Sequence, residues 1–185
     1  GVVACALNLG AGLPDIAAAL RSARGVKGRV EVVPVPAAYT VIIDYAHTPD
    51  ALENILTTVR DLTDRRVICL FGCGGDRDRS KRPAMGSIAA ALADICVVTS
   101  DNPRTEEPVA IIADILKGME GTDTPVRVEP DRRAAIRLAL SEAGTGDVVV
   151  LAGKGHETYQ EIDGVQFHLD EREEVAGFFA RGRRG

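Results

Sequence analysis

The stretch Asp101-Asn102-Pro103-Arg104 places four residues suited to turns or ligand binding side by side, directly after an apolar run. A turn accounts for Asp101, Asn102 and Pro103, since all three residue types favour turns. It does not account for Arg104, whose planar guanidinium matches a carboxylate through two parallel hydrogen bonds. We therefore expect Asn102 and Arg104 to hold a carboxylate of an amino-acid ligand. A plain turn before a helix is the alternative.

A second candidate segment, FGCGGDRDRSKRP at residues 71–83, combines glycines with cations. Glycine lets the backbone turn tightly and approach a ligand closely. Arg77 is the first of several cations that follow, so the segment suits a phosphate or a carboxylate. It is not a Walker loop, because no Gly-Lys-Ser/Thr follows at the required spacing. Cys69 and Cys73 lack a second pair of ligands, so no metal site is predicted. A flexible solvated loop is the alternative.

Two further segments complete the candidate site. DYAHTPD, at residues 44–50, joins a predicted strand to a predicted helix, and Asp44 and His47 there suit the phosphates or ribose of a nucleotide. AGKGHETYQ, at residues 152–160, offers backbone N–H groups around Gly153 and a carboxylate at Glu157 that suits an ammonium. Helix capping by Thr48 and ordinary turns are the alternatives.

The elements that position these segments follow from the apolar pattern. Short runs rich in Val, Ile and Leu are typical of strands buried on both faces, and they alternate with segments of helical periodicity. This alternation predicts an α/β fold, with a Rossmann-like, mostly parallel sheet and helices on both faces. The predicted strands are 40–44, 66–71, 95–99, 126–128 and 147–152. Ligands bind at the carboxyl ends of such strands, so all the candidate segments are expected to meet at one edge of the sheet.

The two ends of the chain depart from this alternation. Asp163-Gly164 lies between the runs 159–162 and 165–168 and predicts a C-terminal β-hairpin. A last helix around Val175 precedes a basic tail, 181–185, which is expected to fray. Residues 1–27 contain two helical segments, 2–9 and 14–24, and fit the sheet poorly. We interpret 1–27 as the end of a preceding domain and 28–185 as the main domain.

Composition excludes several classes of function. The 185 residues carry a formal net charge of −5 and only 4% aromatic residues without Trp, which argues against nucleic-acid partners. No apolar run reaches the ~20 residues that a membrane helix needs, and no signal-peptide pattern opens the chain. The four cysteines show no framework spacing. A cytoplasmic protein with reduced thiols and no membrane partner is therefore predicted.

Taken together, the motifs resemble one family. GRVE, DYAHTPDALENIL, FGCGGDRDRSKRPAMG, TSDNPRTEEP and AGKGHETYQ occur here in that order. They are similar to the C-terminal domain of the Mur ligases, in the branch that adds meso-diaminopimelate as third residue of the peptidoglycan stem peptide. The resemblance covers essentially the whole chain. It implies an ATP-dependent amide ligase, in which the D-glutamyl carboxylate of the UDP-N-acetylmuramoyl dipeptide becomes an acyl phosphate that the incoming amine attacks.

The resemblance also implies roles for individual residues. Members that use L-lysine depart from the Asp-Asn-Pro-Arg motif at its Arg, so Arg104, with Asn102, is expected to meet the distal carboxylate that lysine lacks. A desolvated Arg that faced lysine's ammonium would be unpaired and repelled. The nucleotide-binding residues implied are Asp44 and His47. Those implied for meso-diaminopimelate are Arg77, Asp101, Asn102, Pro103, Arg104, Gly153 and Glu157.

Other parts of the family's machinery have no counterpart in these residues. Its phosphate-binding loop, magnesium ligands and modified lysine lie in a central domain upstream. ATP and Mg²⁺ are therefore expected to be bound mainly there, 1–27 is interpreted as the helical tail of that domain, and the chain alone is expected to be inactive. Its two helices would expose Val3, Leu7, Ile16 and Leu20, which favours dimerisation.

Two other functions stay open at this point. One is a related amino-acid ligase of the folylpolyglutamate synthetase type, against which the Asp-Asn-Pro-Arg and Gly-Lys-Gly-His-Glu motifs argue. The other is a non-catalytic, Rossmann-type nucleotide-binding module. The chain lacks that module's Gly-x-Gly-x-x-Gly fingerprint at the first strand–helix turn.

Overall fold

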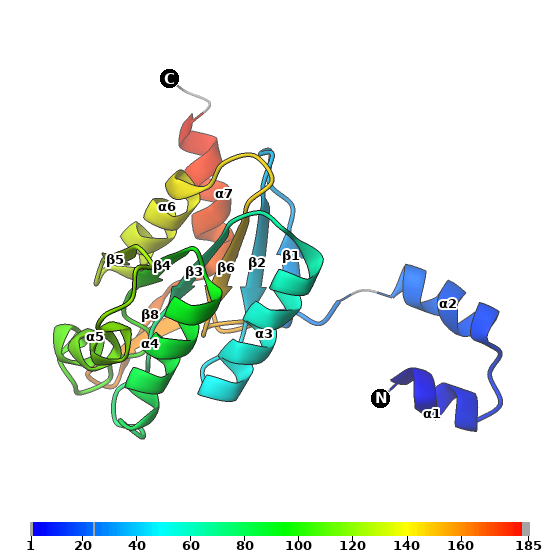
Figure 1. The fold of residues 1–185 in the computed structure, drawn as a ribbon, viewed down its shortest axis with the longest axis horizontal. Coiled ribbons are helices and arrows are strands. Elements are labelled where there is room, and N and C mark those ends of the chain that lie inside the picture. The colour runs from blue at the N-terminus through cyan, green and yellow to red at the C-terminus, as the bar shows by residue number, and fades with distance from the viewer. Residues whose placement is uncertain (1, 24, 183–185) are drawn as a thin grey trace.

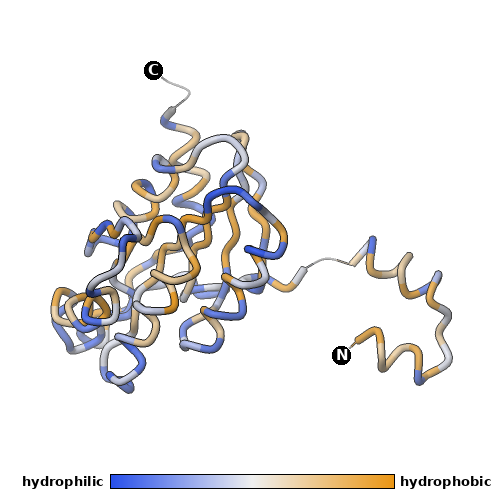
Figure 2. The backbone as a smooth tube through the Cα atoms, viewed as in Figure 1, coloured by the Kyte–Doolittle hydropathy of each residue, from blue (hydrophilic) through white to orange (hydrophobic). Residues whose placement is uncertain are grey.

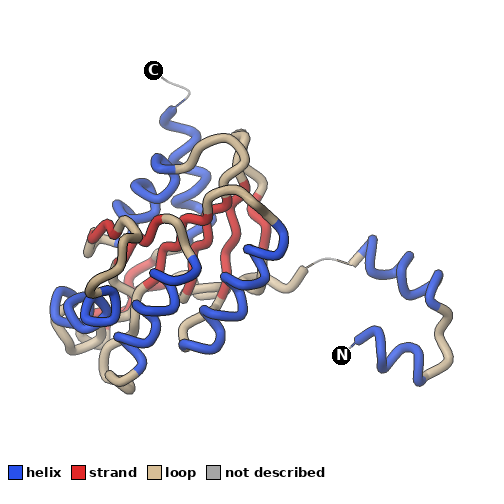
Figure 3. The backbone as a smooth tube through the Cα atoms, in the orientation of Figure 1, coloured by secondary structure: helices blue, strands red, loops and turns tan. Residues whose placement is uncertain are grey.

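A computed structural model describes residues 2–23 and 25–182, and its centre is a six-stranded sheet flanked by helices (Figures 1 and 3). The strand order is β1-β2-β6-β3-β4-β5, and every neighbouring pair is parallel except β1 with β2. The predicted mostly parallel sheet is thus confirmed. Its strands are β1 (Glu31–Val33), β2 (Thr40–Asp44), β3 (Val67–Phe71), β4 (Ile95–Val98), β5 (Val126–Val128) and β6 (Val148–Ala152).

Helices cover both faces of the sheet, and the alternation of side chains along each strand explains how. In β3, Cys69 and Phe71 belong to one core cluster, whereas Ile68 and Leu70 belong to the other. The first cluster includes apolar residues of α3 (Pro49–Leu62), α4 (Lys81–Leu92), α5 (Pro108–Leu116) and the 3₁₀ turn η1 (Lys117–Met119). The second includes those of α6 (Arg132–Glu142) and α7 (Glu171–Gly182).

The predicted C-terminal hairpin is confirmed as β7 (Tyr159–Ile162) paired with β8 (Val165–His168). Asp163 and Gly164 have φ of 49° and 75°, as a tight two-residue hairpin turn requires. Arg104 connects the hairpin to the loop after β4, since its N–H donates to the Glu161 carbonyl (3.1 Å) and its carbonyl accepts from Asp163 N–H (2.9 Å). The sequence did not predict this connection. Of the basic tail, Arg181 and Gly182 lie in α7, and 183–185 are outside the described residues.

The two N-terminal helices, α1 (Val2–Asn8) and α2 (Leu13–Ser22), stand apart from the sheet and are rich in apolar residues (Figures 1 and 2). Val3, Leu7 and Leu20 are 39%, 44% and 50% exposed, as predicted. The prediction for Ile16 is wrong, because that side chain is only 8% exposed. The two helices contact each other, which allows a residue to be sheltered away from the sheet. Residue 24, the end of the predicted segment 14–24, lies outside the described residues.

Within the part of the chain that the structure describes, every helix is too short or too polar to cross a membrane. The boundary between 27 and 28 stays a prediction.

Candidate functional site

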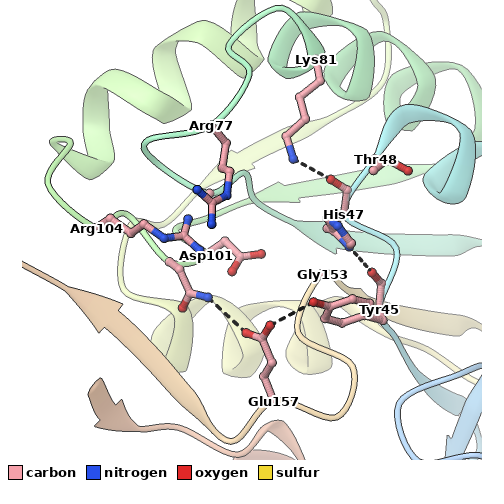
Figure 4. Close-up of a pocket in the computed structure, with 11 residues that line it drawn as sticks. Tyr45, His47, Thr48, Arg77, Lys81, Asp101, Arg104, Gly153 and Glu157 are labelled. Atoms are coloured by element: carbon pink, nitrogen blue, oxygen red, sulfur yellow. Dashed lines mark hydrogen bonds between the residues drawn. The ribbon is translucent and has the colours of Figure 1, made fainter. Parts of the chain in front are cut away.

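All the candidate segments meet at the carboxyl edge of the parallel strands, around a pocket of about 250 Å³ (Figure 4). Its lining comes from the loops after β2, β3, β4 and β6: Tyr45, His47 and Thr48; Gly74, Arg77 and Lys81; Asp101, Asn102 and Arg104; Gly153 and Glu157. Among the residues predicted from the sequence, only Asp44 and Pro103 are outside this lining. The expected meeting of the segments at one edge is confirmed.

The Glu157 carboxylate forms one side of the pocket, and two residues of the lining donate hydrogen bonds to it. Its Oε1 accepts a hydrogen bond from the Tyr45 hydroxyl (3.2 Å), and its Oε2 accepts one from Asn102 Nδ2 (3.1 Å) (Figure 4). Burial, and then the charge of Glu157, raise the pKa of Tyr45, so its phenol remains a donor at neutral pH. The carboxylate therefore has a defined orientation and suits a cationic ligand group.

Cationic groups form the opposite side. The Arg104 guanidinium is anchored by Nη1, which donates to the Gly75 carbonyl (2.8 Å), and by Nε, which lies 3.3 Å from a Glu161 carboxylate oxygen. Arg77 is held only by a hydrogen bond to the carbonyl of Asp76 (3.2 Å) among the described residues. Figure 4 shows both arginine side chains directed into the pocket. This side suits a carboxylate or a phosphate.

Arg104 has an unusual backbone conformation, with a positive φ of 52°. A residue with a Cβ reaches this left-handed region at a cost, so surrounding contacts must stabilise it. Its two backbone hydrogen bonds to the β7–β8 hairpin supply such contacts. The hairpin therefore determines where the guanidinium points.

A third cation, Lys81, is the first residue of α4, and its side chain reaches the N-terminus of α3. Its Nζ donates to the carbonyl of His47 (2.8 Å), and the Thr48 hydroxyl caps the helix by accepting from Ala51 N–H (3.3 Å). Helix N-termini favour anions, so this end of the pocket suits a phosphate. The capping role considered for Thr48 and a role in the pocket are compatible.

Asp101 lines the pocket, although it is only 6% exposed. Its carboxylate forms an ion pair with Lys154, which lies behind the pocket lining. Burial opposes its ionisation, but the positive charges of Lys154, 3.3 Å away, and of Arg132 outweigh burial and lower the pKa of Asp101. The carboxylate is therefore ionised and paired within the protein. A direct contact between Asp101 and the ligand stays a prediction.

Arg132 is a buried anchor for two of the loops. Its guanidinium donates to the carbonyl of Ser100 (3.1 Å) after β4 and to that of Ala152 (2.9 Å) at the end of β6. It also forms an ion pair with Glu171 (2.7 Å), whose pKa is raised by burial despite that partner. Arg132 thus ties the strand ends beneath the pocket to the start of α7.

Asp44 and Pro103 shape the loops from outside the lining. The Asp44 carboxylate accepts hydrogen bonds from Val30 N–H and Ala46 N–H, both at 2.8 Å. The carbonyl of Pro103 accepts one from Glu106 N–H (3.0 Å). The nucleotide contact of Asp44 and the ligand contact of Pro103 stay predictions.

Two glycines allow the loops to approach each other. A Cβ built on Gly75 would lie 1.9 Å from the carbonyl oxygen of Pro103, so no other residue fits without backbone movement. Gly153 has a φ of 115°, and a Cβ there would lie 2.7 Å from an Asp101 carboxylate oxygen. These close approaches are between loops of the protein itself, and the predicted approach of the glycine backbone to a ligand stays a prediction.

The comparison with known proteins gives the family. Residues 28–155 match the model described as Mur ligase, glutamate ligase domain. The chain belongs to the Mur ligase family. This Mur ligase domain is 55% identical over 169 residues to a protein of Syntrophomonas wolfei subsp. wolfei (strain DSM 2245B / Goettingen) named UDP-N-acetylmuramoyl-L-alanyl-D-glutamate--2,6-diaminopimelate ligase, with 91% of this chain and 34% of that protein covered.

Two further matches carry the same name. A protein of Clostridioides difficile (strain 630) is 51% identical over 172 residues, which cover 93% of this chain and 36% of that protein. A solved structure of a ligase with this name superposes with a TM-score of 0.81 at 40% identity, covering 97% of this chain and 37% of that one. The Mur ligase domain described here thus spans about a third of the relatives it matches.

Five residues of this Mur ligase site were not among the site residues predicted from the sequence. Four of them line the pocket: Tyr45, Thr48, Gly74 and Lys81. Glu106 lies behind it, where its carboxylate accepts from Asp76 N–H (2.7 Å) and forms an ion pair with the buried Arg82 (2.8 Å). The hydrogen bond from Arg82, then the one from Asp76, lower the pKa of Glu106 to about 2. All of them lie within the motifs quoted above, but membership of a motif does not by itself identify contacts between loops.

Proposed function

We propose that this chain is the amino-acid-binding domain of an ATP-dependent amide ligase that joins meso-diaminopimelate to UDP-N-acetylmuramoyl-L-alanyl-D-glutamate during peptidoglycan synthesis. One observation carries the proposal. One pocket is lined by the Glu157 carboxylate, by the Asn102 amide that donates to it and by the Arg104 guanidinium, a set of groups suited to an amino-acid head group. The names of the relatives support the choice of diaminopimelate.

The charges of the pocket explain the selectivity that we propose. Arg104 and Asn102 would donate to the distal carboxylate of meso-diaminopimelate, Glu157 would accept from the ammonium beside it, and Arg77 would pair with a second carboxylate. L-Lysine ends in an ammonium with no carboxylate beside it. It would leave the guanidinium of Arg104 without an anion and place two positive charges near each other.

The contribution to the reaction would be positioning. With the distal end held by a carboxylate and an ammonium contact, the amino group at the other end is free to attack the activated D-glutamyl carbonyl. The new C–N bond forms as the C–O bond to phosphate breaks, phosphate leaves with the electron pair, and the amine loses a proton. Holding the amine in place would remove most of the entropic cost of this encounter.

The described residues include groups suited to a phosphate of ATP, but no cluster of side chains suited to Mg²⁺. Lys81 and the start of α3 offer donors for an anion, so they would hold a phosphate group of ATP, which supplies the phosphoryl group that activates the carboxylate. Among the described residues, no group of three or more His, Cys, Asp or Glu side chains could hold a metal ion. We propose that Mg²⁺, with most of ATP, is bound by a central domain of a longer protein.

The same proposal covers residues 1–27, as the helical tail of that domain. The family match begins at residue 28, which supports this boundary. The isolated chain is then expected to release no ADP in the presence of the UDP-linked precursor. With apolar residues of α1 and α2 exposed, it is also expected to dimerise, which sedimentation equilibrium would measure. The four cysteines are free, and we expect a cytoplasmic location.

Isothermal titration calorimetry of the chain with meso-diaminopimelate, L-lysine and NAD tests the function. Binding of meso-diaminopimelate with little or no binding of L-lysine would support it. Equal or tighter binding of L-lysine would refute the role of Arg104. Binding of NAD without meso-diaminopimelate would favour the Rossmann-type module instead.

A further inference from the structure

Lys154 is a fully buried charged side chain beside the pocket, with 0% exposure. It is not part of the pocket lining and lies behind it. Its Nζ donates to Asn102 Oδ1, and it lies 3.3 Å from an Asp101 carboxylate oxygen and 3.4 Å from Glu157 Oε2. An ammonium has three N–H donors, and three oxygens surround this one. A buried charge with this many partners is tightly fixed in position.

Lys154 and the backbone of Glu161 together fix which way the Asn102 amide faces. Asn102 Oδ1 accepts from Lys154 Nζ and also from the backbone N–H of Glu161 (3.0 Å). If the amide turned over, its NH₂ group would face an ammonium and an N–H, so donors would meet donors. Only the observed orientation satisfies all these groups. It places Nδ2 on the side of Glu157, to which it donates (3.1 Å).

The orientation matters because the two ends of the amide have opposite preferences for a ligand. An NH₂ group carries two donor hydrogens. Within the described part of the chain, Asn102 Nδ2 makes one hydrogen bond, to Glu157. The other is available to a carboxylate bound beside Arg104. A reversed amide would present an oxygen there and repel the carboxylate.

We propose that Lys154 is a positioning residue for substrate choice, which holds the Asn102 amide with its donors toward the pocket and holds Glu157 beside it. This inference rests on the proposed binding of meso-diaminopimelate by the pocket. Lys154 itself touches no ligand in this scheme. Its position behind the lining explains how a cation takes part in recognising a group that includes an ammonium.

A simpler role for Lys154 is to neutralise the buried Asp101 carboxylate. The two roles differ in what they predict for Asn102. Neutralisation would act on stability. In the double variant Asp101→Asn, Lys154→Met both charges are removed, so no unpaired buried charge is left and this role predicts little change. Orientation of the amide depends in part on the Nζ donor, so it is weakened in the double variant as well as in Lys154→Met, where, of the two donors to Oδ1, only the Glu161 N–H remains.

The test compares ¹⁵N NMR signals of the Asn102 side-chain amide with ligand binding, in the chain and its variants. The signals are assigned by their disappearance in Asn102→Asp. Lys117→Met is the matched control, because Lys117 is exposed, pairs with Asp114 (2.6 Å) and does not line the pocket. In Lys154→Met and in the double variant, the Asn102 signals are expected to shift and broaden, and meso-diaminopimelate is expected to bind about tenfold more weakly or worse. L-Lysine binding is expected to change little, and Lys117→Met to match the unmodified chain.

Each other outcome has a separate meaning. Unchanged Asn102 signals in the folded double variant would overturn the inference, whatever the binding results. Changed signals with meso-diaminopimelate affinity retained within twofold would overturn the part concerning substrate choice. If the unmodified chain binds no meso-diaminopimelate, the proposed function of this pocket fails, while the signals still decide whether Lys154 orients the amide.

Discussion

Arg104→Met is the most direct perturbation of the proposed substrate selectivity. Methionine keeps an unbranched stem but removes the guanidinium, whose Nη1 donates to the Gly75 carbonyl (2.8 Å) and whose Nε lies 3.3 Å from Glu161. Both residue types carry a Cβ and meet the same backbone cost at a φ of 52°. The difference between the two proteins is therefore in the guanidinium contacts, and the left-handed backbone conformation contributes little to it.

The expected magnitude follows from those contacts. Hydrogen bonds to charged groups contribute about 1.5–3 kcal/mol, so loss of the pairing with the distal carboxylate should weaken meso-diaminopimelate binding by about 2 kcal/mol, or roughly 30-fold. L-Lysine has no carboxylate at that end, so its affinity should stay within about threefold or improve. The free energy of unfolding should fall by only about 1 kcal/mol, since the guanidinium side chain is 20% exposed and makes few internal contacts.

Calorimetric titration of both ligands into the chain and the variant measures the effect. Arg127→Met is the matched control, since Arg127 pairs with Glu142 (2.9 Å) and does not line the pocket. Its affinities should equal those of the unmodified chain. Arg104 would not be the selective residue if Arg104→Met weakened both ligands equally, or if meso-diaminopimelate kept its affinity.

Three further substitutions test how the site is supported. Glu106→Gln should lower the free energy of unfolding by about 2 kcal/mol near neutral pH. The pKa of Glu106 is lowered to about 2 in the folded chain, so this difference in the free energy of unfolding should be complete above about pH 4.5 and vanish as the pH falls towards 2. Urea unfolding at several pH values would measure it. Gly75→Ala should cost about 2 kcal/mol and weaken ligand binding, because its Cβ would clash with Pro103, whereas Gly177→Ala, with nothing within 4 Å, should be neutral or stabilising. Arg132→Met should lower the free energy of unfolding by about 3–5 kcal/mol, since it leaves a buried carboxylate unpaired; a loss below 1 kcal/mol would contradict the anchoring role.

Much of the fold could be predicted because its signals are local. The apolar runs and the helical periodicity depend on neighbouring residues, and the hairpin depends on Asp163-Gly164. Their predicted positions agree with the structure to within a residue for most strands. The strand order was not predicted, since insertion of β6 between β2 and β3 depends on pairing between distant segments. The exposure of Ile16 was mispredicted for a related reason, because periodicity cannot specify which helix covers it.

The candidate site could be located in part for the same reason. Parallel strands bring their carboxyl ends to one edge, so the general position of His47, Arg77, Arg104 and Glu157 followed from topology. The burial of Lys154 could not be predicted in this way. Lysine between two glycines suggests an exposed loop, yet this one is fully buried, because oxygens from another loop surround its ammonium. These contacts with Asp101 and Asn102 form only when the two loops come together in the folded protein.

The direction of each polar group in the pocket depends on contacts between loops more than on the sheet. The sheet brings the loop after β4 near the loop after β6, but it leaves the conformation of Arg104 open. That conformation is stabilised by hydrogen bonds to Glu161 and Asp163 in the hairpin, and the same hairpin supplies the second donor to Asn102 Oδ1. The hairpin therefore helps to orient both groups proposed to meet the distal carboxylate, together with Lys154 and Gly75. A shift in the position of the hairpin would move Asn102 and Arg104 together. Substitution of residues that never contact the ligand can therefore alter substrate choice.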